Sequence, residues 1–248
     1  MSAQPVRYRS VRQQNSFRAT LRRLVGVLLV FFLTFSFFTA IVSESYRIDT
    51  ASMSPTLAEG DRVFLLPLIY GPRLRAFGLV VPGFGVPQRG DLVAVRPGYM
   101  PPATIWNRIA DPFVRFLSLQ RRRAGAGTDW RSSVQIKRIV GLPGDTIRFE
   151  RFVAYIKPEG SSVFRTEFDL APVPYRIATG ARPADWEALD PFGEAGDLQV
   201  LGPGEYFVLS DDRLSGVDSR HWGPVTYEEI DGKIVFRYWP FASWGRLR

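Results

Sequence analysis

The sequence contains no cysteine and only one histidine, His221. Without cysteine there can be no disulfide bond, no cysteine nucleophile and no thiolate metal site. A single histidine also excludes zinc sites built from several histidine or cysteine ligands, and a histidine-based catalytic triad would have to use His221. No glycine-rich phosphate loop is present. The number of aspartates does not exclude a catalytic aspartate dyad, but no local sequence motif supports one. We therefore expect neither a metal nor a cofactor.

Lysine is almost as scarce as histidine. Of the 32 basic residues, three are lysines (Lys137, Lys157 and Lys233), which leaves 29 arginines. A general preference of the lineage for arginine explains this ratio. Arginine cannot release its proton near neutral pH, whereas a lysine can do so once its pKa is lowered. Each retained lysine is therefore a candidate for a role that arginine cannot fill.

Acidic residues are absent from the first 23 positions. The same segment carries six arginines: Arg7, Arg9, Arg12, Arg18, Arg22 and Arg23. After residue 23 the chain has 26 basic and 24 acidic residues, a balance of only +2. A nucleic-acid-binding protein is expected to carry its basic surface on the folded part of the chain. The charge distribution therefore disfavours a nucleic-acid partner.

Charge of either sign is absent from residues 24–43, which read LVGVLLVFFLTFSFFTAIVS. As a helix this stretch reaches about 30 Å, the thickness of the hydrocarbon core of a bilayer. A cleaved signal peptide usually has a shorter apolar stretch and ends in a small-x-small site, of which residues 39–41 and 41–43 are poor versions. A buried core helix would be amphipathic, whereas this stretch is apolar on all sides. We predict a retained transmembrane helix at 24–43, with residues 1–23 as a basic tail in the cytoplasm and residues 44–248 outside.

Turn signals recur through the rest of the chain, where helical periodicity is scarce. Gly60-Asp61, Gly90-Asp91 and Gly144-Asp145 each precede a short apolar or alternating run, and Gly204 precedes EYFVL. Short β-branched and aromatic runs at such spacing are typical of an all-β domain. The carboxyl end, KIVFRYWPF, reads as a last strand that Pro240 interrupts.

Two stretches depart from this pattern of turns and short strands. In residues 97–131, one helical face would carry Ile105, Ile109, Phe113, Phe116 and Leu117. This pattern is typical of a helix on a membrane surface and equally of a packed accessory helix. Residues 157–201 read as an inserted region of β-structure and loop. A third stretch, 64–87, is more apolar than an exposed loop, so it is either buried core or an apolar rim that touches lipid.

Four short segments carry candidate catalytic residues. They are DTASMSPTL at 49–57, RGDLV at 89–93, QIKRIVGLPGD at 135–145 and DDRLSGVDSRHWG at 211–223. A serine is a poor nucleophile unless a base lies beside it. A lysine among apolar side chains has a lowered pKa and can then take the proton of a serine. Taken singly, Ser52 reads as a loop residue and Lys137 as a surface lysine beside Arg138.

Together, the four segments resemble bacterial type I signal peptidase (leader peptidase) in residue type, order and position. The pattern of that family has SMxPTL just after a transmembrane helix, then an RGD with an apolar strand, then KRxVGxPGD, and last GDNRxxSxDSRxWG. The resemblance implies a mainly antiparallel β catalytic domain of the signal-peptidase type at 44–248. Residues 97–131 and 157–201 would be insertions in that domain.

The resemblance also implies roles for individual residues. Ser52 would be the nucleophile and Lys137 the general base of a serine/lysine dyad. The backbone N–H of Ser52 and the hydroxyl of Thr50 would form the oxyanion hole. The run Asp218-Ser219-Arg220 would support the lysine strand through a carboxylate–guanidinium pair.

Side chains near this dyad would form two shallow apolar pockets for small side chains of the substrate. By resemblance and proximity in the sequence, the candidate residues are Ile48, Met53 and Ile139. His221 stands where the family usually has an aromatic residue, so a packing role is expected for it.

Residues 210–216 depart from the family pattern at four positions. Ser210 and Asp212 replace the usual glycine and asparagine, and Leu214 stands where aspartate is common. Gly216 occupies the position whose serine usually hydrogen-bonds the catalytic lysine. Ser215, Ser219 or a water molecule would then have to orient Lys137.

The function implied is a membrane-bound serine endopeptidase that cleaves N-terminal signal peptides from exported preproteins after small-x-small sites. Its partners would be preproteins and membrane lipid, with proximity to the secretion translocon. Its location would be the bacterial inner membrane, with a single pass and the catalytic domain on the outer face.

Three alternatives remain on the same scaffold. The first is a conjugation-specific or other specialised processing peptidase, which only substrate tests separate. The second is a self-cleaving repressor, against which the membrane anchor argues. The third is a catalytically inactive paralogue that acts as a membrane scaffold, against which the presence of both Ser52 and Lys137 argues.

Overall fold

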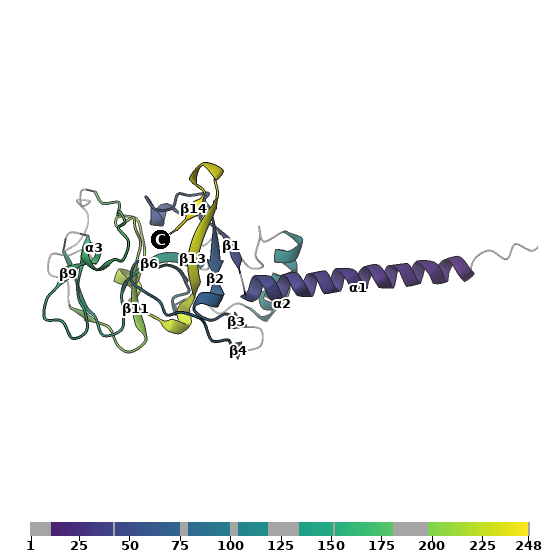
Figure 1. The fold of residues 1–248 in the computed structure, drawn as a ribbon, viewed down its shortest axis with the longest axis horizontal. Coiled ribbons are helices and arrows are strands. Elements are labelled where there is room, and N and C mark those ends of the chain that lie inside the picture. The colour runs from purple at the N-terminus through teal and green to yellow at the C-terminus, as the bar shows by residue number, and fades with distance from the viewer. Residues whose placement is uncertain are drawn as a thin grey trace, which may run out of the picture.

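A long helix projects from one end of a β domain (Figure 1). The computed structural model describes residues 11–41, 43–74, 79–99, 104–118, 134–150, 152–180 and 198–247. The long helix is α1 (Val11–Ile41), in which the 22 residues Phe17–Phe38 are long and apolar enough to cross a membrane. Among the described residues no other helix meets that criterion. The helix begins well before Leu24 because neither proline nor glycine separates residues 11–23 from the apolar run.

An eight-stranded sheet forms the centre of the β domain. Its strand order is β1-β2-β13-β5-β6-β11-β12, and β14 also pairs with β13. The bounds are β1 (Glu44–Arg47), β2 (Arg62–Leu66), β5 (Leu92–Val95), β6 (Gln135–Gly141), β11 (Glu205–Leu209), β12 (Val225–Thr226), β13 (Ile230–Trp239) and β14 (Gly245–Arg246). Every pairing of these strands is antiparallel. The predicted class, a mainly antiparallel β domain behind one N-terminal apolar helix, is confirmed.

Smaller elements surround the central sheet. A four-stranded sheet has the order β10-β7-β8-β9, and β3 pairs with β4. The bounds are β3 (Arg73–Leu74), β4 (Leu79–Val80), β7 (Thr146–Glu150), β8 (Val153–Lys157), β9 (Arg165–Thr166) and β10 (Gln199–Val200). The short helices are α2 (Ile105–Leu117), α3 (Glu167–Leu170) and α4 (Ser219–Trp222).

The Gly-Asp turns have a common construction that explains why they begin strands. Each glycine has a positive φ that a side chain would strain: Gly60 (+89°), Gly90 (+82°) and Gly144 (+85°). Each following aspartate accepts a backbone N–H from three residues earlier: Asp61 from Ala58 (3.0 Å), Asp91 from Gln88 (3.1 Å) and Asp145 from Leu142 (2.6 Å). The carboxylate closes the turn and leaves the next residues free to pair as a strand.

The predicted insertions are described in part. Within 97–131 the chain forms α2, whose Phe113 and Phe116 rings pack on α1; residues 100–103 and 119–133 lie outside the described residues. Within 157–201 it forms β9, α3 and β10, and residues 181–197 lie outside the described residues.

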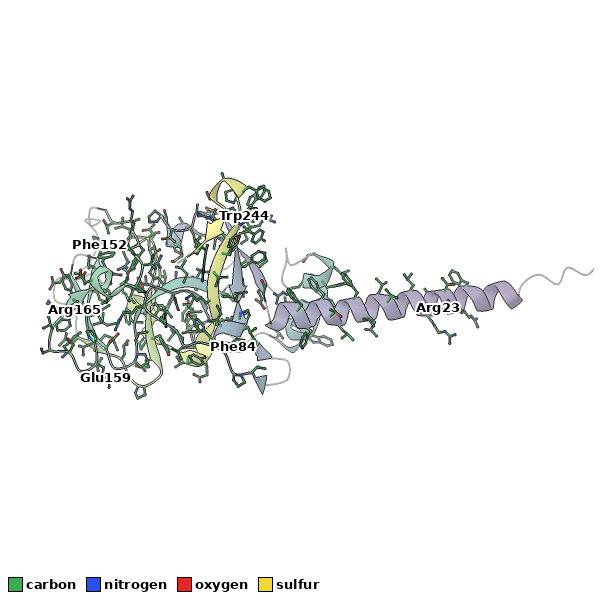
Figure 2. All side chains as sticks on the ribbon, in the orientation of Figure 1. Arg23, Phe84, Phe152, Glu159, Arg165 and Trp244 are labelled. Carbon is green, nitrogen blue, oxygen red and sulfur yellow. The ribbon has the colours of Figure 1, made fainter. Side chains whose placement is uncertain are left out.

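The apolar stretch 64–87 divides into a buried and an exposed part. Leu65 and Tyr70 belong to the core, whereas Phe84 and Val86 are 85% and 68% exposed. Figure 2 shows Phe84 at the end of the β domain nearest α1. The core interpretation therefore holds for the first part, and contact of the second part with lipid stays a prediction.

Candidate active site

Ser52 lies in a short 3₁₀ turn, Ala51–Met53, between β1 and β2. Met53 and Leu57 are buried, and the backbone N–H of Leu57 donates to the Met53 carbonyl at 2.8 Å. On the other side, the Ser52 carbonyl accepts the backbone N–H of Asp212 at 3.0 Å. The Thr50 and Ser52 hydroxyl oxygens are 3.1 Å apart. The loop is thus anchored in the core, while the Ser52 side chain stays only partly buried.

Lys137 lies on β6, where it pairs with Val93 of β5. Only 1% of Lys137 is exposed, so the alternative of a surface lysine is wrong. Its Nζ atom donates to Ser52 Oγ at 3.4 Å, across 85 residues of sequence. This is long for a hydrogen bond, as catalytic contacts often are before substrate binds. The fold therefore brings the predicted dyad into contact.

Burial is the main influence on the Lys137 ammonium. Loss of hydration disfavours the charged form and lowers the pKa of Lys137 from 10.5 to about 8. The Asp218 carboxylate opposes this shift, Arg220 adds to it, and Asp211 opposes it more weakly. A pKa near 8 leaves an appreciable fraction of neutral amine at physiological pH, which a general base requires.

Arg138 points to the other side of β6 and is also buried. Its guanidinium donates to both carboxylate oxygens of Asp211, at 2.8 and 2.7 Å, to the Gly90 carbonyl at 2.9 Å and to the Thr56 hydroxyl at 3.2 Å. Thr56 in turn donates to Asp211 at 2.5 Å. The lysine strand is thereby tied to the Ser52 loop. Sequence reasoning did not single out Asp211 or Thr56, although both lie within the recognised segments.

Asp218 and Arg220 form a buried ion pair, in which Nε and Nη2 of Arg220 donate to the two carboxylate oxygens of Asp218 at 2.7 and 2.8 Å. Asp218 also accepts the backbone N–H of Ser210 at 2.8 Å, and the Ser219 hydroxyl accepts that of Val208 at 3.0 Å. Both contacts brace β11 and the residue that follows it. Since β11 pairs with β6, the run 218–220 contacts the strand beside the lysine strand, and its supporting role for Lys137 remains a prediction.

Two of the candidates for orienting Lys137 have other partners. Ser215 Oγ donates to Asp212 at 2.7 Å, and Ser219 Oγ accepts from Val208 as described above. Among the described residues, no hydrogen bond of Lys137 other than that to Ser52 is recorded. The hydrogen bonds of the described residues therefore do not identify the group that positions Lys137.

The three pocket candidates are all buried, but they lie in two clusters. Ile48 and Met53 pack in one core cluster, and Ile139 packs in another with Val93. Ile139 is two residues from Lys137 on the same side of β6, so it stays close to the dyad. Their role in binding substrate remains a prediction.

His221 accepts the backbone N–H of Asp218 through Nδ1 at 3.3 Å and so takes part in the capping box of α4. Burial lowers the pKa of His221, and the Asp218 carboxylate opposes that shift. No contact between His221 and Ser52 is recorded among the described residues. These contacts favour the structural role over a histidine-based triad.

Comparison with known proteins gives the same class as the site. The family model "Signal peptidase, peptidase S26" matches residues 20–239. Signal peptidase I of Bacillus caldolyticus is 39% identical over 108 residues, which cover 44% of this chain and 55% of that relative. Probable signal peptidase I-1 of Synechocystis is 26% identical over 224 residues, which cover 90% of this chain and 84% of that relative.

A solved signal peptidase I from Enterococcus faecalis is also similar. It is 20% identical, covers 60% of this chain and 96% of that chain, and has a TM-score of 0.31.

A buried lysine in contact with a serine, on an antiparallel β domain, is the arrangement that a serine protease of the dyad class requires. The chain belongs to the signal peptidase family, peptidase S26. The predicted class of enzyme, a signal peptidase I, is confirmed, and neither a conjugation-type peptidase nor an inactive scaffold is favoured.

Proposed function

We propose that this chain removes N-terminal signal peptides from exported preproteins by cutting after small-x-small sites, with Ser52 as nucleophile and Lys137 as general base. The contact of 3.4 Å between Lys137 Nζ and Ser52 Oγ carries the proposal. The amine is buried and readily deprotonated, and the serine beside it is accessible. These are the conditions under which a serine becomes a nucleophile near neutral pH.

The neutral Lys137 amine takes the hydroxyl proton as Ser52 Oγ attacks the carbonyl carbon of the scissile peptide bond. The negative charge that develops on the carbonyl oxygen is stabilised by the backbone N–H of Ser52 and the Thr50 hydroxyl. As the peptide bond breaks, the Lys137 ammonium returns its proton to the leaving amine, and the signal peptide stays esterified to Ser52. Lys137 then deprotonates a water molecule, which hydrolyses the ester.

Helix α1 supports a location for the site beside the membrane. Ser52 comes 14 residues after Phe38, the last residue of the candidate membrane span (52 − 38 = 14). We infer that the arginine-rich residues before the span remain in the cytoplasm and that the β domain lies on the outer face of the inner membrane. A signal peptide crosses the same bilayer, so tethering gives its cleavage site a high effective concentration at Ser52.

The experiment that tests this function uses the full chain in liposomes with a model preprotein. We expect a single cut after a small-x-small site, located by mass spectrometry of both products. A preprotein with tryptophan at the residue before the cut should not be processed, because shallow pockets exclude it. Ser52→Ala should be inactive. Processing that persists in Ser52→Ala, or cuts that ignore the tryptophan substitution, would contradict the proposal.

A further inference from the structure

The hydroxyl of Ser210 is buried without a hydrogen-bond partner among the described residues. Ser210 is fully buried, and its Oγ atom makes no hydrogen bond there. Its backbone is held firmly, since its N–H donates to Asp218 at 2.8 Å and its carbonyl accepts Arg213 Nε at 2.8 Å. A buried hydroxyl without a partner is costly, so its retention calls for an explanation.

Strand register places Ser210 next to Lys137. The last recorded pair between β11 and β6 is Leu209 with Arg138. Continuing this antiparallel register by one residue sets Ser210 opposite Lys137. Residues directly opposite in an antiparallel pair point to the same side of the sheet, with Cβ atoms about 4.5–5.5 Å apart. The unpartnered hydroxyl and the lysine side chain therefore lie side by side on one face.

Gly216 lies directly against this hydroxyl. A Cβ atom on Gly216 would be 2.1 Å from Ser210 Cβ and 2.2 Å from Ser210 Oγ. The Ser210 side chain thus fills the space that a side chain at position 216 would need. Relative to the family pattern, the glycine and the serine have been exchanged, and the same small volume holds one hydroxyl in either arrangement.

We propose that the Ser210 hydroxyl is the positioning residue for Lys137, in place of the serine that position 216 lacks. One N–H of the amine donates to Ser210 Oγ after a small rotation of either side chain, and this directs the nitrogen lone pair at the Ser52 hydroxyl. The charged groups that act on the amine are the carboxylates of Asp218 and Asp211 and the guanidinium of Arg220. None of these supplies the neutral acceptor that the hydroxyl provides.

This inference rests on the proposed function, and Ser210→Ala tests it. We expect kcat for preprotein cleavage to fall about 10- to 100-fold with little change in KM, because the base is misplaced. The acid limb of the pH profile should move to lower pH, since the ammonium loses an acceptor that favours the charged form. Ser161→Ala, in a loop after β8, is the control and should match the wild type.

The exchange itself gives a stricter test. Ser210→Gly should be as impaired as Ser210→Ala, and Gly216→Ser alone should lower the melting temperature because the two side chains overlap. The double variant Ser210→Gly/Gly216→Ser should recover most of kcat and the original pH profile. An unchanged kcat and pH profile in Ser210→Ala would overturn the inference, as would a folded double variant no better than Ser210→Gly. A wild type that cuts no preprotein would instead overturn the proposed function.

Helix α2 carries a second, independent feature, an apolar stripe that is largely exposed in the described part of the chain. Trp106, Phe113 and Leu117 are 78%, 53% and 81% exposed and recur at helical spacing. The helix is tied to the membrane span: the Phe113 and Phe116 rings pack on Phe32 at 4.6 and 5.2 Å. Phe32 lies six residues inside the end of the span at Phe38, about 9 Å deep along the helix.

The polar side of α2 points to the boundary of the span. Arg115 donates to Glu44 at 3.0 Å, and Glu44 is the first residue of β1, just beyond the anchor. An exposed apolar stripe that continues the surface of a membrane helix fits acyl chains. We infer that α2 lies in the outer leaflet beside α1, with its stripe facing lipid.

The absence of cysteine allows a direct test. Trp106→Cys and Leu117→Cys, each labelled with an environment-sensitive fluorophore, should show blue-shifted emission in liposomes and quenching by lipids that carry a spin label on the acyl chain. Val163→Cys, 58% exposed in a loop after β8, is the control and should report water. Labels at 106 and 117 that behave like the label at 163 would overturn the inference.

Discussion

Replacing Lys137 with arginine should abolish preprotein cleavage. The guanidinium keeps the positive charge but cannot release its proton near neutral pH, so no group remains to deprotonate Ser52. Loss of a general base typically lowers the rate about 10²- to 10⁴-fold. The measurement is kcat of the purified variants in liposomes. Lys157→Arg is the matched control, because Lys157 lies on β8 against the Phe164 ring and outside the site.

The pH profile gives the same prediction without a mutation. Cleavage needs the neutral amine, and burial lowers the pKa of Lys137 to about 8. Below that pH the amine is protonated, so kcat/KM should fall about tenfold for each unit of pH; above it, kcat/KM should level off. Full activity in Lys137→Arg, or a profile that stays flat from pH 6 to 9, would remove Lys137 from the role of base.

Much of the domain could be predicted because its signals are local. A glycine with positive φ followed by a turn-closing aspartate is decided by four residues, so Gly60, Gly90 and Gly144 indicated strand starts. The Ser52 and Lys137 segments were recognised by motif, and their contact at 3.4 Å agrees with that prediction. In the structure Arg138 and Lys137 lie on opposite sides of β6, as the alternation of side chains along a strand requires.

Other features depend on contacts between distant segments. Alternation separates two faces of a strand but does not say that both are buried, and β6 is covered on both sides, so Lys137 and Arg138 are each 1% exposed. The sequence showed that positions 210 and 216 depart from the family pattern. Only the structure shows that the Ser210 side chain fills the space that a side chain at position 216 would occupy. The periodicity of α2 likewise indicated a helix without indicating that it packs on α1.

The ion pair between Arg213 and Glu167 is another contact without a local signal, and it joins residues that are 46 apart in sequence. Both side chains are buried, and the guanidinium donates to the two carboxylate oxygens at 2.8 and 2.5 Å. Arg213 also donates to the carbonyls of Ser210 and Phe152, each at 2.8 Å. This pair therefore links α3 to the residue that follows β11, beside the active site.

Arg213→Met should destabilise the protein strongly, because it leaves the Glu167 carboxylate buried without its counter-ion. Removal of one partner of a buried pair costs about 3–5 kcal/mol. The double variant Arg213→Met/Glu167→Leu should cost less than Arg213→Met alone, since no isolated charge remains. The measurement is the free energy of unfolding of the full chain in detergent, from urea titrations followed by tryptophan fluorescence.

The matched control for this prediction is a pair on the surface. Arg148 and Glu150 are 2.6 Å apart with side chains 39% and 42% exposed, so Arg148→Met should cost about 0–1 kcal/mol. An Arg213→Met variant no less stable than Arg148→Met would show that Glu167 becomes neutral or hydrated when Arg213 is lost. If the prediction holds, Arg213→Met should also lower kcat, because the carbonyl of Ser210 loses the donor that fixes it behind Lys137.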